Sequence, residues 1–575
     1  MTSSPTPTRA PALTAWLDDF LASYCRHRPV NATFIGLHTH DERLPDLSEH
    51  GVGDALADAE SLLARLRTLP DEDASDVETL DRALARGFLR IQRWELGSNH
   101  QRGNPSFYAG EAAFGVIGLL RRPFSPLEPR LQAARHRIDA IPALLEVARP
   151  SAVGAPEAWL DRAEGECQGL LSLLGDGLDR FLADARVQAP ALRAAADRAI
   201  AAVAAFRQHL RAARGRAARE PGCGSEAFDL LLREGHFLSE DAAEIARVAA
   251  DQLAESEAEL RTSAGALGAP TWQDALATLA DRHPPAGDYY ARYHECWMEC
   301  RRLARERQLL TWPDFPIRYV PRPPWVREAA PHLYFLSYHS PAPYDDLPEV
   351  EYLVTPIEPS MLPADRDRLL RATNDSVIKL NHVVHHGAIG HHVQNWYAMR
   401  APSRIGRIAA VDCASRIALF CGGTMAEGWA CYATELMDEI GFMTPLERLA
   451  VRHGRLRMAA RAVVDVHLHT QAWTLGQAAA FYRERVGMTE AAARAEAVKN
   501  SMFPATALMY LVGTDAIHRL RRELAARPGF TLAAFHDRLL SCGSIPVSLA
   551  AAALRAERRP LAGRDADETL LLEDR

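Results

Sequence analysis

Histidines are concentrated in one short segment of this sequence. The segment from 381 to 396 reads NHVVHHGAIGHHVQNW, and its histidines are His382, His385, His386, His391 and His392. A single histidine on a helix is usually a satisfied core or surface residue, but five so close together are hard to explain that way. Neutral imidazole is the commonest protein ligand for metal ions, and a bound cation offsets the cost of burying a polar cluster. The segment therefore predicts a metal site.

The spacing of these histidines restricts how they can meet. On an unbroken helix, residues three, four or seven positions apart lie on one face. His385 and His391 are six positions apart, so they share a face only if the helix is broken between them. Gly387 and Gly390 permit such a break because glycine tolerates backbone conformations that other residues avoid.

A second segment supplies a carboxylate. The sequence from 421 to 436 reads CGGTMAEGWACYATEL, and Glu427 stands among apolar neighbours in what we expect to be a buried helix. A buried carboxylate needs a partner. An arginine would serve, but the histidine cluster lies about 36 residues earlier, which makes a metal-ligand role the better interpretation.

The composition limits the class of protein. The chain has 575 residues, 48% apolar and 24% charged, which is typical of a soluble globular protein. Its net charge of -8 argues against a nucleic-acid or anionic-membrane partner. Nine scattered cysteines without a CxxC pair fit a reducing compartment. Because no signal peptide or membrane-spanning apolar run is visible, we expect a cytoplasmic protein with no membrane partner.

Long segments rich in Ala, Leu, Arg and Glu predict a mostly α fold. Apolar residues recur at helical spacing in 54–68, 128–148, 156–184 and 188–215. Ser239, followed by two acidic residues, predicts the start of another helix that runs to about Leu260.

Proline becomes dense after about residue 309, and three short runs there are typical of β-strands. These runs are IRYV (317–320), LYFLSY (333–338) and EYLV (351–354). We therefore expect a small β element near residues 315–357 among the helices.

The change of texture divides the chain into three regions of one integrated fold. They are an amino-terminal helical region (1–300), a Pro-rich segment with short strands (301–360) and a helical metal-site region (361–575).

The histidine-rich segment and the segment around Glu427 resemble two sequence signatures of a known family. HHGAIGHHVQ resembles the HExxPGHHxQ signature, and AEGWACYATE resembles the EGWALYAE signature, of the bacterial family called domain of unknown function 885. Three further blocks are similar to blocks of that family, namely 29–51, 461–474 and 503–513. The resemblance covers nearly the whole chain.

That family is similar to the gluzincin-type metallopeptidases, which are mostly helical and hold zinc with two His and one Glu. The resemblance therefore implies a large zincin-like helical fold. It also implies that His385, His391 and Glu427 are the metal ligands. One divalent transition metal would bind there, zinc before the alternatives iron, manganese or copper.

The resemblance also suggests catalytic residues. Tyr510 falls where such enzymes place a phenol beside an oxyanion. Asp465 and His469 match the family's Asp and His, and at a spacing of four they could form a pair that orients a ligand or the substrate.

The sequence departs from the family pattern at the general base. The motif's Glu is His386 here, and imidazole both accepts protons and binds metals. If His386 turns inward, the donor set becomes three His and one Glu. The motif's Pro is Ile389, the second Glu of EGWALYAE is Thr434, the Gln of the last block is Thr506, and His467 stands where the family has Gly.

Three functions remain open. The first is a metal-dependent hydrolase of a small amide- or peptide-like substrate, with His386 or Tyr510 handling protons. The second is a non-hydrolytic metal enzyme, redox or lyase, of specialised metabolism. The third is a catalytically inactive binding protein. In zincin-like enzymes an extended segment can bind a peptide by strand addition, and EYLV is the candidate for that edge.

Overall fold

The segments with helical spacing form helices in the computed structural model, which describes residues 11–69, 75–216, 218–333, 337–345, 349–408 and 422–557. Its α-helices are α1 (Pro11–His27), α2 (Pro29–Ile35), α3 (Glu49–Leu66), α4 (Asp76–Ser98), α5 (Pro105–Arg121), α6 (Leu127–Ala148), α7 (Glu157–Ser172), α8 (Leu178–Ala185), α9 (Pro190–Ala212), α10 (Ser225–Leu230), α11 (Ala242–Ala266), α12 (Trp272–Ala277), α13 (Tyr289–Glu306), α14 (Pro363–Ala372), α15 (His391–Met399), α16 (Arg404–Ile408), α17 (Gly423–Glu439), α18 (Pro445–His469), α19 (Leu475–Val486), α20 (Glu490–Met502), α21 (Met509–Leu524), α22 (Leu532–Ser541) and α23 (Val547–Ala556). Shorter 3₁₀ and π segments are η1 (Arg149–Ala152), η2 (Leu173–Gly177), η3 (Leu231–Gly235), η4 (Thr278–Asp281), η5 (Ala286–Asp288), η6 (Pro324–Val326), η7 (Ala330–His332) and η8 (Val377–Gly387).

The prediction of a mostly α fold is confirmed, and the four predicted helical segments are helical. The segment 156–184 is not one helix, because a π turn with a kink at Gly175 separates α7 from α8. The predicted start at Ser239 is wrong. Asp241 caps α11 instead, since its side chain accepts from the backbone N–H of Glu244, and the helix continues to Ala266.

The β element is a pair of parallel strands, β1 (Ile317–Pro321) and β2 (Val350–Val354). Two of the three predicted runs therefore form strands. The middle run, 333–338, lies partly outside the described residues, but Tyr338 makes an isolated bridge to Tyr352, and the backbone N–H of Leu353 donates to the carbonyl of Ser337 at 2.8 Å. β2 is thus flanked on both sides, so the expectation of a free edge along EYLV is wrong at this point.

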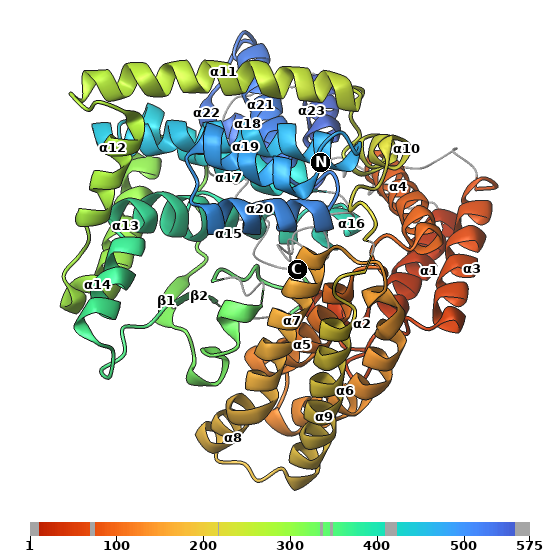
Figure 1. Cartoon of the computed structure of the whole chain (residues 1–575). Helices are drawn as coiled ribbons and strands as arrows, with labels where there is room; N and C mark the ends of the chain where they lie inside the picture. The colour runs from red at the N-terminus through yellow and green to blue at the C-terminus, as the bar shows by residue number, and fades with distance from the viewer. Residues whose placement is uncertain are drawn as a thin grey trace.

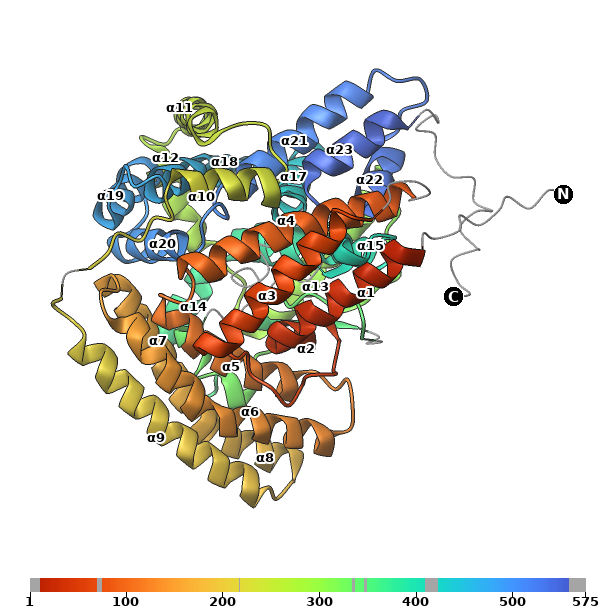
Figure 2. The same cartoon turned by 90° about the vertical axis from the view of Figure 1, so that its right-hand side faces the viewer.

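Buried side chains from distant parts of the chain form the core. The largest cluster joins Trp16 of α1, Tyr293 of α13, Val384 of η8 and Trp429 of α17. A second cluster lies within the bundle of α5, α6, α7, α8 and α9, which Figure 1 shows at the bottom of the molecule. A third packs α11 and α12 against α18, α19 and α20. Figure 2 shows α1, α2, α3 and α4 side by side on one face.

None of the described helices combines the length and the apolar character that crossing a membrane requires.

Candidate metal centre

A break in the helical backbone brings His385 and His391 together. His385 lies near the end of η8, and His391 is the first residue of α15. Between them, Ala388 and Gly390 have non-helical backbone angles. A side chain at Gly390 is excluded, because a Cβ there would lie 1.9 Å from the carbonyl oxygen of His385. The helix break that we predicted from the glycines between His385 and His391 is therefore present in the structure.

Neighbouring elements hold the broken segment in place. The indole N–H of Trp297, on α13, donates to the carbonyl of Gly387 at 3.0 Å. The indole N–H of Trp429, on α17, donates to the carbonyl of Ile389 at 2.8 Å. Both carbonyls would otherwise be left without helical partners, so the two tryptophans offset the cost of the break.

Three candidate ligands converge on one point. Nε2 of His385 and Nε2 of His391 each lie 3.5 Å from Oε2 of Glu427. All three side chains are largely buried, with exposed side-chain fractions of 16% for His385, 1% for His391 and 8% for Glu427. Oε2 of Glu427 makes no hydrogen bond with any described residue.

These separations suit a metal better than hydrogen bonding. An N–H···O bond is usually 2.7–3.2 Å long. In a tetrahedral site with bonds of about 2.05 Å, two ligand atoms lie about 3.3–3.4 Å apart. Two imidazoles and one carboxylate are also a donor set that first-row divalent metals accept. The arrangement therefore fits one divalent transition metal ion. Away from this cluster of histidines, no group of three His, Cys, Asp or Glu side chains among the described residues could hold a metal ion.

His386 lies beside this site. One nitrogen from each of His385, His386 and His391 can be chosen so that all three lie within 4.8 Å of one another. The ring centroid of His386 is 4.7 Å from that of His385 and 5.4 Å from that of His391. Nδ1 of His386 lies 2.7 Å from the carbonyl oxygen of Asn381. Nδ1 is therefore the donor, which leaves the lone pair on Nε2.

The two outer histidines of the cluster have other partners. Nδ1 of His382 lies 3.0 Å from the hydroxyl of Tyr293. Nε2 of His392 lies 2.9 Å from the carbonyl of Phe315, and its ring stacks on that phenyl ring. These contacts attach the segment to α13 and to the loop before β1. They give His382 and His392 a structural role that does not require a metal ion.

A close helix crossing brings Tyr510 to Glu427. α17 and α21 meet at Gly428 and Gly513, where a Cβ on Gly513 would lie 2.0 Å from the carbonyl oxygen of Thr424. Only glycine fits such an approach. As a result the hydroxyl of Tyr510 donates to Oε1 of Glu427 at 3.1 Å, which fixes the orientation of the carboxylate.

Burial controls the charge of the imidazoles. It lowers the pKa of His385, and it lowers the pKa of His386 well below the usual value. Burial raises the pKa of Glu427, but the two neighbouring imidazoles lower it further, so that it lies well below its usual range. A neutral imidazole and an ionised carboxylate are the protonation states that metal binding requires.

Arg461 packs against the ring of Tyr510. Its guanidinium carbon lies 4.6 Å from the centroid of the Tyr510 ring, and its Nε donates to Glu496 at 2.6 Å. Sequence reasoning gave Arg461 no role, because only the fold reveals which ring it covers.

Asp465 and His469 are fully buried but contact other elements. Asp465 accepts from the backbone N–H groups of Ala505 and Leu508, at 3.1 and 2.9 Å. Nε2 of His469 lies 2.9 Å from the carbonyl of Asn500 and 3.6 Å from Oδ1 of Asp465. Neither side chain has a described contact with the three candidate ligands. Asp465 shapes the turn that precedes Tyr510, which is a positioning role.

Apart from His386, three positions that depart from the family pattern, Thr434, Thr506 and His467, have contacts elsewhere. Glu435, next to Thr434, lies 2.6 Å from Nε2 of His518. The hydroxyl of Thr506 donates to a carbonyl one turn back. The ring of His467 lies 4.4 Å from that of Trp473.

Sequence reasoning missed Tyr338. Its ring is nearly parallel to that of His391, with centroids 6.4 Å apart, and it lies 6.2 Å from the ring of His386. The signal was only an aromatic residue in a predicted strand, which does not indicate what the ring covers.

Comparisons with known proteins show the family of the chain and, separately, solved structures with a similar fold. A family described as "Bacterial protein of unknown function (DUF885)" matches residues 29–554. A solved "putative lipoprotein of unknown function" from Shewanella oneidensis is 22% identical, with a TM-score of 0.76, covering 95% of this chain and 100% of that one. A solved "putative lipoprotein" from Colwellia psychrerythraea is 18% identical, with a TM-score of 0.73, covering 95% and 98%. No curated protein matches the sequence.

Proposed function

The chain belongs to the bacterial DUF885 family, and we propose that it is a metal-dependent hydrolase of a small amide- or peptide-like substrate. The observation that carries the proposal is the convergence of His385, His391 and Glu427 at 3.5 Å, with an unbonded carboxylate oxygen at the centre. We further propose a zincin-like relationship, with His386 standing where the usual general base would be a Glu.

A divalent metal ion bound by these residues would polarise a substrate carbonyl and make a water molecule more acidic. Zinc is the first choice, because two His and one carboxylate with an open position are typical of catalytic zinc sites. Iron, manganese and copper are the alternatives.

The chain's own residues would handle protons and orientation. Since Nδ1 of His386 is held by the Asn381 carbonyl, Nε2 is the atom that can accept a proton beside the candidate ligands. Tyr510 has a single hydroxyl hydrogen, and it is directed at Glu427. That geometry favours positioning of the ligand over direct donation to an oxyanion.

A second function rests on the proximity of His386. Because a nitrogen of His386 can lie within 4.8 Å of those of His385 and His391, a set of three His and one Glu is within reach. Such a set suits iron, manganese or copper as well as zinc, which favours a non-hydrolytic redox or lyase reaction as the alternative. A catalytically inactive binding protein is the third possibility, and it predicts no turnover with any metal.

The test is metal-dependent turnover on a panel of dipeptides and N-acyl amino acids. Zinc-loaded protein should cleave at least one of them, chelator treatment should abolish cleavage, and re-added zinc should restore it. His391→Ala should be inactive, whereas His382→Gln, a neighbour held by Tyr293, should keep most activity. Cleavage that survives chelation and His391→Ala would refute the proposal, and so would the absence of cleavage in zinc-loaded protein.

We propose a cytoplasmic location because the scattered cysteines fit a reducing compartment. The two solved structures of similar fold are each described as a "putative lipoprotein", so cell fractionation has to include the membrane and envelope fractions. Recovery of the native protein in either of those fractions would contradict the cytoplasmic assignment.

A further inference from the structure

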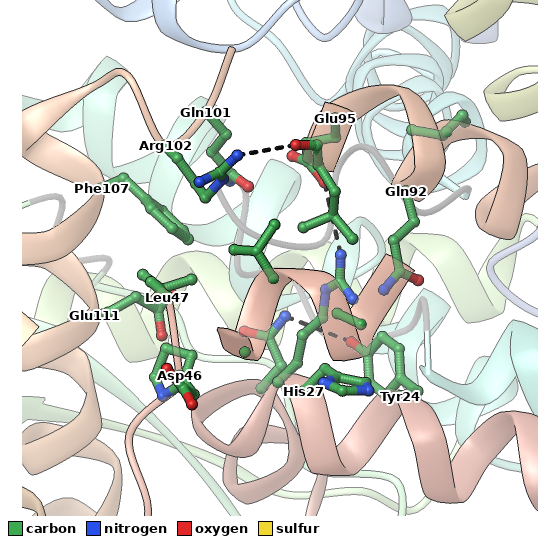
Figure 3. Close-up of a pocket in the computed structure, with 18 of the residues that line it drawn as sticks. Tyr24, His27, Asp46, Leu47, Gln92, Glu95, Gln101, Arg102, Phe107 and Glu111 are labelled. Atoms are coloured by element: carbon green, nitrogen blue, oxygen red, sulfur yellow. Dashed lines mark hydrogen bonds and ion pairs between the residues drawn. The ribbon is translucent and has the colours of Figure 1, made fainter. Parts of the chain in front are cut away.

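A cavity lies among the amino-terminal helices α1, α2, α3, α4 and α5 (Figure 3). Its volume is ≈ 80 Å³, which is room for about two to three water molecules at ~30 Å³ each. None of its lining residues belongs to the candidate metal centre. It is therefore a separate place where a small molecule could bind.

Three polar side chains of this cavity have hydrogen-bonding capacity that the protein does not use. Nη2 of Arg28 lies 3.6 Å from Oε2 of Glu95, too far for a hydrogen bond, and neither charged group makes a closer polar contact with a described residue. Gln92, one turn before Glu95 on α4, is only 4% exposed, and its amide has no hydrogen bond within the described chain. Buried polar groups are nearly always hydrogen-bonded, so water or a ligand has to complete these three.

The wall of the cavity carries charges of both signs. Arg28 and Arg102 supply two guanidinium groups, Glu95 and Glu111 supply two buried carboxylates, and the exposed Asp46 supplies a third carboxylate. Figure 3 shows Arg102 and Gln101 on one side of Glu95 and Gln92 on the other. Burial raises the pKa of Glu95, and the charge of Arg28 opposes that rise. A further positive group next to Glu95 would stabilise its ionised form.

The rest of the wall is apolar. The guanidinium of Arg28 lies 4.8 Å from the ring centroid of Phe88, which fixes it against that wall. Val52, Ala55 and Ile91 are buried and complete a surface that suits a short aliphatic group.

We propose that this cavity binds a small zwitterion, a free α-amino acid of about the size of glycine or alanine. Its ammonium group would bind Glu95 and Gln92, its carboxylate would bind Arg28 or Arg102, and its short side chain would lie against the apolar wall. Both charged partners would then gain charge-assisted hydrogen bonds.

Ligands of a single charge fit less well. An anion would satisfy Arg28 but would lie against the carboxylate of Glu95, and a cation would lie against the guanidinium groups. Only a molecule that carries both charges matches the alternation of charge around the wall.

Isothermal titration of the full-length protein tests the proposal with L-alanine, glycine, acetate and methylammonium. We expect the two amino acids to bind in the millimolar range or tighter, and the two singly charged ions to bind at least ten-fold more weakly. Because an amino acid can also chelate a metal, the titration is repeated on Glu427→Ala, which should bind L-alanine like the wild type. This repeat separates failure of the cavity from failure of the metal centre.

Two variants locate the site. Glu95→Gln should weaken L-alanine binding about ten-fold or more, the effect of losing one charge-assisted hydrogen bond, whereas Glu60→Gln on the exposed face of α3 should leave it unchanged. Ala55→Leu fills the cavity and should abolish binding even if Glu95→Gln folds poorly. The proposal is overturned by absent binding of both amino acids, by acetate binding as tightly as L-alanine, or by unchanged affinity in a folded Ala55→Leu protein.

Discussion

Removing the hydroxyl of Tyr510 tests how the site is assembled. Tyr510→Phe deletes one hydrogen bond of 3.1 Å to Oε1 of Glu427, while the ring keeps its packing against Arg461 at 4.6 Å. Loss of a partner that orients a metal ligand usually costs about 10–100-fold in metal affinity. At about 1.36 kcal/mol per decade this is about 1.4–2.7 kcal/mol, which agrees with the ~1.5–3 kcal/mol of a hydrogen bond to a charged group.

The assay is competition between the metal-free protein and a chelator of known zinc affinity. Tyr432→Phe is the matched control, because this buried tyrosine of α17 has its hydroxyl 2.8 Å from Nε2 of His536, away from the candidate ligands. We expect a loss of zinc affinity in Tyr510→Phe and none in Tyr432→Phe. Equal affinity of wild type and Tyr510→Phe would refute the argument that this hydroxyl holds the ligand.

Three further predictions follow from the fold and the site. Gly513→Ala should destabilise the protein by about 1–3 kcal/mol in denaturant unfolding, because its Cβ would meet the backbone of α17. Gly454→Ala is the control, since open space surrounds that glycine, and it should be neutral or stabilising by up to about 1 kcal/mol. Equal effects of the two substitutions would contradict the close crossing of α17 and α21. Wild-type protein should cleave unstructured peptides slowly, since a placed proton carrier contributes about 10²–10⁴-fold, and zinc-loaded His386→Glu should recover part of that rate; no gain would contradict the role of position 386. Although burial lowers it, hydrogen bonds to two carboxylates raise the pKa of His38 to about 9. The contribution of His38 to the free energy of unfolding is therefore complete below about pH 6.5 and is lost as the pH rises through about 9. His38→Gln should remove this part of the pH dependence of the unfolding free energy.

Features that depend on local sequence could be predicted. The helical spacing of apolar residues predicted helices in four segments, and the β-preference of the residues predicted the strands at 317–320 and 351–354. The glycines between His385 and His391 predicted the break, because backbone freedom is a property of the residues themselves.

Features that depend on distant partners could not be predicted. Nothing near His392 in the sequence indicates that its ring is bonded to the carbonyl of Phe315. The family resemblance places Tyr510 at the site, but its neighbours in the sequence do not indicate that its hydroxyl bonds Glu427. The same holds for Asp465, whose role follows only from the turn that it caps. The covered edge of β2 arises from a return of the chain that short-range patterns do not describe.

We propose that His385, His391 and Glu427 bind one divalent metal ion, and the metal content of the protein tests this most directly. Elemental analysis of protein purified without added metal, then after zinc loading and desalting, should give about one ion per chain. Glu427→Ala should lose that ion, whereas Glu435→Ala, whose carboxylate is held by His518, should keep it. Full occupancy in Glu427→Ala, or a wild-type protein that retains no metal after loading, would contradict the account.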